Sequence, residues 1–380
     1  MKFKTLNKLS NKGIEEILKY GTLVEDDEEA IIVRSFDMHE MELNEKVLSV
    51  ARAGAGVNNI PLDKFAEKGV VVFNTPGANS NAVKELTLCG LLIAARDVVG
   101  GVNWVKENKD LEGLAKAVEK NKSKFAGGEI YQKNILIIGL GVIGVKVANA
   151  CCSLGMNVYG YDPYLNVKNA LKLDKNVEYI TTYEELLEKI DYISVHVPLN
   201  PYTKEMINDS IFTKVKPGVK LLNFSRGELV NEADLQKAIE NNIISKYVTD
   251  FPNNNVANMP NVIAIPHLGA STEEAEDICA EMAVKQTKDY IELGTIVNSV
   301  NYPECILGKK ACENRVTILY KNEETLYTNI QEILKEIKAK EIVMKTNNKY
   351  GYIVIECDVV EEGTINRIKE LENVYKVRVI

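Results

Sequence analysis

Two side chains in this chain of 380 residues could together move a proton and hold a carboxylate. His267 lies in the segment Ile265-Pro-His267-Leu-Gly-Ala-Ser271, and Arg226 lies in Asn223-Phe-Ser-Arg226-Gly-Glu-Leu-Val230. A histidine can accept the proton of a hydroxyl group because its imidazole titrates near neutral pH. An arginine keeps its charge and binds carboxylate oxygens through two parallel hydrogen bonds. If the chain binds NAD, this pair suits hydride transfer at a carbinol carbon.

The other two histidines of the chain are not expected to have a catalytic role. His196 ends an apolar run and is followed closely by Pro198, which predicts a structural role. His39 lies in a charged stretch, which predicts a position on the surface.

The segment Gly139-Leu-Gly141-Val-Ile-Gly144 predicts a nucleotide site because of what flanks it. The apolar run 134–138 is typical of a buried strand, 145–154 of a helix, and 157–161 of a second strand that ends at Asp162. In such a unit the glycines permit a tight turn, the approach of a pyrophosphate and close packing of helix on strand. Asp162 would bind the ribose hydroxyls and repel a 2′-phosphate, so NAD is favoured over NADP. A merely structural βαβ unit is the alternative.

Residues 135–267 alternate between strand and helix patterns, which predicts a parallel sheet with helices on both faces. After Asp162, strands are expected at 177–180, 192–197, 219–224, 247–249 and 262–265, and helices at 184–189 and 232–240. Ligands of open parallel sheets bind outside the carboxyl ends of the strands. We therefore expect the polar side chains that follow these strands to meet in one crevice.

Further units are predicted on both sides of this sheet. The N-terminal part has strand patterns at 30–33, 47–51 and 70–73, and a helical stretch at 82–99 leads toward the nucleotide unit. A helix capped by Ser271 is expected to reach Leu293 and to end at Gly294, after which 297–302 returns to the first unit. The tail has strand patterns at 316–320, 342–346, 351–357 and 374–379, with helices at 325–338 and 361–371. That βαββαβ order is the ferredoxin-like arrangement.

Composition limits the possible partners. A net charge of −8 argues against nucleic acid or an anionic membrane. Residues 1–9 lack the apolar core of a signal peptide, and no apolar stretch reaches the length of a membrane span. The seven cysteines are scattered without C-x-x-C spacing or a zinc-like partner set, so we expect reduced thiols and no metal site. These observations predict a cytoplasmic protein that acts on a small molecule.

With these motifs in order, the chain resembles the D-2-hydroxyacid dehydrogenase family. The resemblance covers about residues 25–305. Its motifs are Arg52-Ala-Gly-Ala-Gly-Val57, Asn74-Thr-Pro76 with Asn79-Ser80, Gly139–Gly144, Tyr161-Asp-Pro163, His196-Val-Pro-Leu199, Asn223–Val230 and Pro266–Ser271.

The resemblance implies an architecture. A Rossmann-type doubly wound parallel sheet at 93–281 would be inserted in a split flavodoxin-like α/β substrate domain formed by 1–92 and 282–306. A C-terminal ferredoxin-like α+β domain at 314–380 resembles the ACT type, a small-molecule sensing module. A homodimer that forms through the nucleotide-binding domains is also implied.

The resemblance assigns roles to residues as well. It implies His267 as the acid and base, Arg226 as the anchor of the substrate carboxylate, and Asp250 beside the nicotinamide carboxamide. The implied NAD contacts are Gly139, Gly141, Val142, Ile143, Gly144, Asp162, Pro198, Ser225, Asp250 and Gly269. The implied substrate contacts are Arg34, Arg52, Ala53, Gly54 and Asn79. Arg34 and Arg52, with Lys124 as a further candidate, match basic positions of the family's substrate cleft. Because a phosphate demands cations, this match favours 3-phosphoglycerate as the substrate of an NAD-dependent oxidation.

The sequence departs from the family pattern at two places. The family carries a glutamate shortly after the position of Asp250, and this glutamate raises the pKa of the catalytic histidine. This chain has Asn253-Asn-Asn255 there, so we expect a lower pKa for His267 and oxidation that persists to lower pH. The tail loop Lys321-Asn-Glu-Glu-Thr325 lacks the Pro-Gly pair of ACT ligand loops, so an architectural tail is as consistent as a serine sensor. Two other functions stay open: a reductase of glyoxylate, hydroxypyruvate or another 2-oxo acid, and an NAD-sensing binding protein of the corepressor type.

Overall fold

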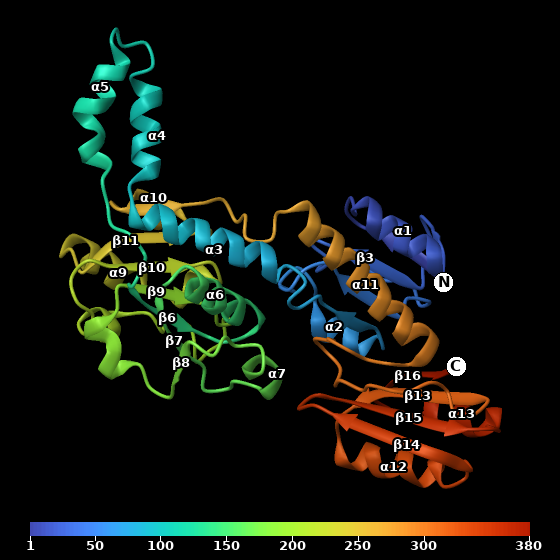
Figure 1. Cartoon of the computed structure of the whole chain (residues 1–380). Coiled ribbons are helices and arrows are strands. Elements are labelled where there is room, and N and C mark those ends of the chain that lie inside the picture. The colour runs from blue at the N-terminus through green and yellow to red at the C-terminus, as the bar shows by residue number, and fades with distance from the viewer. The chain divides into compact units, whose positions relative to one another are not determined.

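The computed structural model describes residues 1–380, and contacts within the chain divide it into two compact units (Figure 1). The first unit contains Met1–Asn79 and Glu273–Ile380, and the second contains Ser80–Thr272. The domain boundaries expected from the sequence, 92/93 and 281/282, lie later in the chain and fall inside two helices.

The divisions fall at the first residues of those helices because of how each helix packs. Helix α3 (Ser80–Ala95) packs along its length on α6 (Val142–Ser153) and on the sheet of the second unit. Helix α11 (Glu273–Leu293) packs on α1 (Asn11–Tyr20) and on the N-terminal sheet of the first unit. Each helix therefore belongs as a whole to one unit.

The second unit is built on a parallel sheet with the strand order β12-β11-β10-β9-β6-β7-β8. The chain order reverses between β6 and β9, and sheets of this kind bind ligands at that switch point. All of these strands were expected, but β9, β10 and β12 end earlier because apolar residues such as Phe224 continue into buried loops. The strands are β6 (Asn134–Ile138), β7 (Asn157–Tyr161), β8 (Val177–Ile180), β9 (Tyr192–Val195), β10 (Val219–Asn223), β11 (Ile244–Thr249) and β12 (Val262–Ala264).

Helices cover both faces of this sheet. Strand β6 alternates between two hydrophobic clusters, with Ile137 on the face of α3 and α6 and Ile138 on the face of α9. Helix α6 begins at Val142 rather than at 145, so the glycine turn leads directly into it. The remaining helices are α7 (Val167–Ala170), α8 (Asp209–Phe212), α9 (Glu232–Glu240), α10 (Asn254–Asn258) and the 3-10 turns η2 (Glu184–Lys189) and η3 (Gly227–Leu229).

A helical hairpin extends from this unit, and the sequence did not predict it (Figure 1). The expected helix 82–99 breaks after α3, and α4 (Val98–Glu107) turns away by 72°. The side chain of Asp97 starts α4 by accepting the backbone N–H of Gly100 at 3.3 Å. The hairpin returns through α5 (Leu114–Asn121) and η1 (Lys122–Phe125). By length and apolar character no single helix could cross a membrane, whereas the bent pair α3 and α4 together could.

The first unit begins with a parallel sheet in the order β2-β1-β3-β4-β5, which is the flavodoxin-like order. The strands are β1 (Lys2–Thr5), β2 (Thr22–Leu23), β3 (Ala30–Val33), β4 (Ser49–Arg52) and β5 (Val71–Phe73), with α2 (Leu62–Glu67) before β5. The segment 297–302 returns to this sheet as expected, but it forms no strand and pairs through the one bridge of Phe73 with Ser299.

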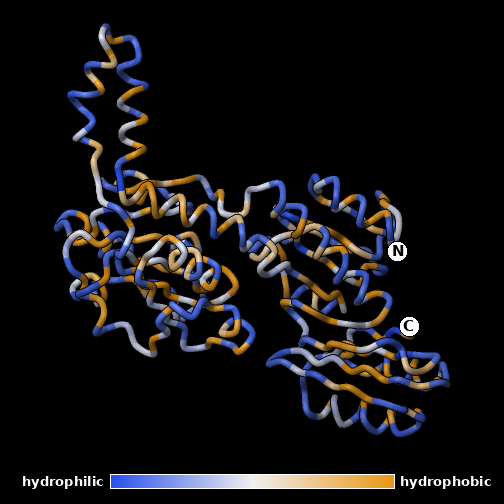
Figure 2. The backbone as a smooth tube through the Cα atoms, viewed as in Figure 1, coloured by the Kyte–Doolittle hydropathy of each residue, from blue (hydrophilic) through white to orange (hydrophobic).

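The C-terminal part of the first unit is an antiparallel sheet in the order β14-β15-β13-β16. Its elements follow the expected βαββαβ order: β13 (Asn314–Lys321), α12 (Glu324–Leu334), β14 (Ala339–Thr346), β15 (Tyr350–Cys357), α13 (Glu362–Lys369) and β16 (Val374–Val379). Strand β15 buries Ile353 toward its own two helices and Tyr352 toward the core of the N-terminal sheet. Figure 2 shows hydrophobic positions both along the strands and along the helices.

Candidate active site

The glycine turn between β6 and α6 has the geometry of a phosphate cradle. Gly139 has a φ of +94°, and a Cβ there would lie 2.6 Å from the carbonyl oxygen of His196. A Cβ on Gly144 would lie 1.8 Å from the carbonyl oxygen of Gly139, so neither position accepts a side chain. Gly141 has open space around it, and no side chain caps the start of α6. The free N–H groups of this helix end can therefore receive a pyrophosphate.

Asp162 lies directly after β7 and is tied to the same turn. Its carboxylate oxygens accept the backbone N–H of Leu140 and the backbone N–H of Tyr164, each at 2.8 Å. Since a carboxylate oxygen accepts more than one hydrogen bond, both oxygens can still receive ribose hydroxyls. The acid that the sequence predicts for a ribose thus stands beside the phosphate cradle.

His196 and Pro198 follow β9, on the other side of the switch point. The His196 Nε2 atom lies 2.8 Å from the Ser194 hydroxyl, and its Nδ1 atom is buried without a partner. Burial lowers the pKa of His196 to about 4, so this imidazole is neutral at physiological pH. The carbonyl oxygen of Pro198 accepts the Thr203 hydroxyl at 2.6 Å, which fixes the loop after the strand.

Ser225 and Arg226 follow β10 and are held by its last residue. The side chain of Asn223 accepts the Ser225 N–H at 3.1 Å and donates to the Arg226 carbonyl oxygen at 2.7 Å. The Ser225 hydroxyl donates to the carbonyl oxygen of Val195 at 2.8 Å. The Arg226 guanidinium donates back to the Ser225 carbonyl oxygen at 2.6 Å, so the side chain folds over its own turn. These bonds place Arg226 at the carboxyl edge of the sheet.

Asp250 is 1% exposed and connects β11 with the loop that carries His267. One carboxylate oxygen accepts the N–H of Gly269 at 2.9 Å, and the other is buried without a partner. Burial raises the pKa of Asp250, while the Gly269 N–H and the charges of His267 and Arg226 act in the opposite direction. A buried acceptor without a donor is costly, so the free oxygen is suited to an amide N–H of a bound ligand.

His267 and Arg226 meet on one aromatic ring, that of Phe251. The His267 ring lies with its centroid 4.6 Å from the Phe251 centroid, tilted by 49°. The Arg226 guanidinium carbon lies 5.6 Å from the same centroid, within the range of a cation–π contact. His267 also has a φ of +35°, a left-handed conformation that is uncommon outside glycine and concentrates at functional sites. The two residues that the sequence selected thus share one contact surface.

An open cavity of about 590 Å³ lies beside this ring. Its lining includes Asp250, Phe251, His267 and two carboxylates that the sequence analysis did not select, Glu228 and Glu232. The Glu232 carboxylate accepts the side-chain amides of Asn253 and Asn255, the latter at 3.2 Å. The asparagine segment therefore binds Glu232 and makes no hydrogen bond to the His267 ring.

The sequence reasoning missed Phe251 as well as the carboxylates of Glu228 and Glu232. Phe251 directly follows Asp250 at a strand end, which is the one signal that could have pointed to it. Glu232 is the first residue of α9, and such acids normally indicate no more than a helix start.

The expected substrate residues lie in the first unit, at the carboxyl ends of β3, β4 and β5. The Arg52 Nε atom donates to the carbonyl oxygen of Arg34 at 2.9 Å, so these two arginines are neighbours. Gly54 has a φ of +158°, a backbone conformation that other residues rarely adopt, which explains a glycine there. The Ala53 N–H donates to the carbonyl oxygen of Val33 at 2.8 Å. Asn79 lies in the loop after β5.

Comparison with known proteins gives consistent matches. A family model for the NAD binding domain of D-isomer specific 2-hydroxyacid dehydrogenases matches residues 88–269. The D-3-phosphoglycerate dehydrogenase of Bacillus subtilis is 32% identical over 318 residues, which cover 78% of this chain and 58% of that protein. The protein of the same name from Haemophilus influenzae is 30% identical over 356 residues, which cover 90% of this chain and 83% of that protein.

A solved structure shares the fold. The NAD+-bound 3-phosphoglycerate dehydrogenase of Entamoeba histolytica aligns with a TM-score of 0.60 and 24% identity, covering 81% of this chain and 99% of that one. This chain spans 58%, 54% and 50% of the length of the curated relatives from Bacillus subtilis, Methanocaldococcus jannaschii and Rattus norvegicus.

Proposed function

We propose, since this chain belongs to the D-isomer specific 2-hydroxyacid dehydrogenase family, that it oxidises D-3-phosphoglycerate to 3-phosphohydroxypyruvate with NAD. The reaction is the entry to serine biosynthesis. The observation that carries the proposal is the shared contact of Arg226 and His267 with Phe251, at a sheet edge that also holds the phosphate cradle.

In this proposal each residue at the sheet edge has one task. The Arg226 guanidinium binds the substrate carboxylate and polarises the carbonyl oxygen that forms. The His267 imidazole takes the proton of the 2-hydroxyl group and returns it in the reverse direction. When bound, NAD supplies the hydride acceptor.

The chain's own groups also suit the cofactor. The free oxygen of Asp250 would accept an N–H of the nicotinamide carboxamide, because it is a buried acceptor that lacks a donor. Asp162 would accept the ribose hydroxyls, and its charge disfavours the 2′-phosphate of NADP. Gly139, Gly141 and Gly144 leave room for the pyrophosphate at the start of α6.

The choice of a phosphorylated substrate is supported by Arg34 and Arg52 in the first unit. Both follow strands of a parallel sheet at its carboxyl edge, and their positive charges suit a phosphate. Ala53, Gly54 and Asn79 complete the proposed substrate contacts. The split substrate domain, the inserted nucleotide-binding domain and the C-terminal domain from residue 314 remain part of this proposal, with the first two boundaries moved from 92/93 and 281/282 to the starts of α3 and α11.

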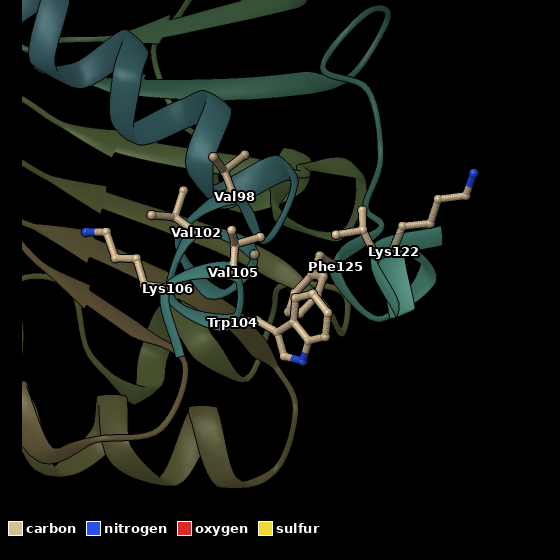
Figure 3. Close-up of a pocket in the computed structure, with 9 residues that line it drawn as sticks. Val98, Val102, Trp104, Val105, Lys106, Lys122 and Phe125 are labelled. Carbon is tan, nitrogen blue, oxygen red and sulfur yellow. The ribbon is translucent and has the colours of Figure 1, made fainter. Parts of the chain in front are cut away.

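A homodimer through the nucleotide unit completes the assembly that we propose, and the hairpin of α4 and α5 is its candidate interface (Figure 3). A cavity of about 570 Å³ on the hairpin is lined mainly by apolar side chains, with Lys106 and Lys122 also in the lining. Among them Val98, Val102 and Val105 are 48%, 47% and 43% exposed. Contiguous apolar side chains at a surface mark interaction sites, and a second copy of this hairpin offers a matching apolar surface.

A cytoplasmic location of the protein is also part of this proposal. The C-terminal sheet is proposed as an ACT-like module. The loop at 321–325 contains no Pro-Gly pair, so an architectural role and serine sensing remain equal alternatives. Isothermal calorimetry with L-serine separates them: heat of binding supports the sensor, and its absence at millimolar serine supports the architectural role.

A substrate panel followed by NADH absorbance tests the main proposal. We expect turnover with 3-phosphoglycerate, and a loss of kcat of about 10²–10⁴-fold in His267→Asn with NADH binding retained. Turnover of glyoxylate or hydroxypyruvate alone would assign the chain to the reductases. NADH binding without any turnover would favour a cofactor-sensing protein.

A further inference from the structure

Arg34, a proposed phosphate ligand, is already paired with a carboxylate of its own unit. Its guanidinium lies 2.7 Å from the carboxylate of Glu276, in the first turn of α11. Both side chains are 38% exposed, so the pair lies at the surface of the unit.

The backbone around Arg34 is fixed independently of this ion pair. The side-chain oxygen of Asn7 accepts the N–H groups of Arg34, Ser35 and Phe36, each at 3.0 Å. The Arg34 carbonyl oxygen accepts the Nε–H of Arg52 at 2.9 Å. The loop therefore keeps its position when Glu276 is removed, and only the guanidinium loses a partner.

Arg34 and Arg52 converge on the same part of α11. The thiol of Cys279, one turn after Glu276, is buried, and burial raises its pKa. The charges of Arg34 and Arg52 oppose this rise, and the charge of Glu276 adds to it. All three charges therefore lie within electrostatic reach of one buried side chain, and the two guanidiniums carry one positive charge more than Glu276 neutralises.

A phosphate group competes directly with Glu276. A phosphate monoester carries a charge of about −1.5 to −2 at neutral pH and offers several acceptor oxygens. A half-exposed ion pair contributes little to stability, because water already solvates both partners. The stronger anion can thus replace the carboxylate, and Glu276 can turn to solvent without burying its charge.

We propose that Glu276 is an exchangeable counter-ion of Arg34: it gives way to the phosphate of the substrate and pairs with Arg34 again on release. This inference rests on the proposed function, because it takes Arg34 as a phosphate ligand. Glu276 acts through Arg34 and does not touch the reacting atoms, so it sets the affinity for phosphorylated ligands rather than the rate of hydride transfer.

Kinetics of Glu276→Gln test the proposal in the full-length protein. We expect the KM for 3-phosphoglycerate to fall about two- to fivefold, with kcat nearly unchanged. The KM for unphosphorylated glycerate is expected to stay the same, and Glu276→Asp is expected to restore most of the wild-type KM. Glu281→Gln is the matched control, because Glu281 lies on the same helix, is 36% exposed and pairs with Lys285 instead.

Inorganic phosphate gives a readout that does not depend on turnover. We expect calorimetry to show tighter phosphate binding to Glu276→Gln than to the wild type, and no such gain in the Arg34→Gln background. If 3-phosphoglycerate is not oxidised by the wild type, the proposed function fails, and phosphate binding still decides the role of Glu276. A rise in KM, an equal gain in Glu281→Gln, or no gain in phosphate affinity overturns the inference.

Discussion

The imidazole of His267 and the ring of Phe251 are in contact, with centroids 4.6 Å apart and planes tilted by 49°. The guanidinium of Arg226 lies over the same ring at 5.6 Å, so one phenyl group sets the spacing of a proposed base and a proposed anchor. We therefore propose Phe251 as a positioning residue of this site, together with the Ser225 carbonyl oxygen that accepts a hydrogen bond from the Arg226 guanidinium.

Replacing Phe251 with leucine is expected to lower kcat by about ten- to a hundredfold, because small displacements of reacting groups are costly. The affinity for NADH should change little, since Phe251 is not a proposed cofactor contact. Steady-state kinetics and NADH fluorescence titration measure the two effects. Phe251→Tyr is the control, because it keeps the ring, and an equal loss in that variant would contradict the assignment.

Asp250→Asn is expected to stabilise the protein without cofactor while weakening its use of NAD. Burial raises the pKa of Asp250, so the folded protein binds this proton more tightly than the unfolded chain. Stability is thus lost as pH rises from the unfolded pKa of about 3.9 through the higher folded value. Thermal denaturation should show the stability of the variant rising relative to that of the wild type as the pH increases above the unfolded pKa of about 3.9. An unchanged difference above this pH would contradict this account.

The regular elements of the nucleotide unit could be predicted from the sequence, and two groups of elements could not. Strands β6 and β7 were found to the residue, because short apolar runs there are bounded by polar residues and glycine. Strand β1 was missed because only Phe3 in it is buried. The break before α4 was missed because its valines continue the apolar pattern of α3, and the cap at Asp97 became visible only in the structure.

At the site, the positions of Arg226 and His267 could be predicted because both residues follow predicted strands. Arg226 and His267 follow β10 and β12, which lie on either side of β11 in one parallel sheet, and the carboxyl ends of parallel strands lie at one edge. The contact with Phe251 depends on how two loops fold over that edge. The hydrophobic pattern of the sequence does not predict the conformation of these loops. The same holds for Asn253 and Asn255, whose amides bind Glu232 rather than the imidazole.

Restoring an acid in the asparagine segment is expected to change the pH dependence of the reaction. A carboxylate favours the protonated form of a nearby imidazole, so Asn254→Glu should move the acid limb of kcat/KM for oxidation to higher pH. Asn258→Glu is the matched control, because Asn258 lies one turn further along α10 and adds the same charge. Superimposable acid limbs for the wild type and Asn254→Glu would refute the expectation.

Removing the charge of Asp162 is expected to relax the preference for NAD. Asp162→Asn keeps an acceptor for the N–H of Leu140, so the glycine turn should remain in place. Without the negative charge, a 2′-phosphate is no longer repelled, and kcat/KM for NADP should rise relative to that for NAD by about tenfold. Kinetics with both cofactors measure the ratio. A ratio that stays constant would show that Asp162 supports the turn and does not select the cofactor.

A charge on the apolar surface of α4 is expected to separate the proposed dimer. Val102 is 47% exposed and lines the hairpin cavity, so Val102→Asp would place a carboxylate in a desolvated interface. Sedimentation velocity should show a monomer, with circular dichroism of a folded protein. Asn103→Asp adds the same charge at an exposed position of α4 outside the cavity lining, and it should remain dimeric. If both variants behave like the wild type, the hairpin is not the interface between the two copies.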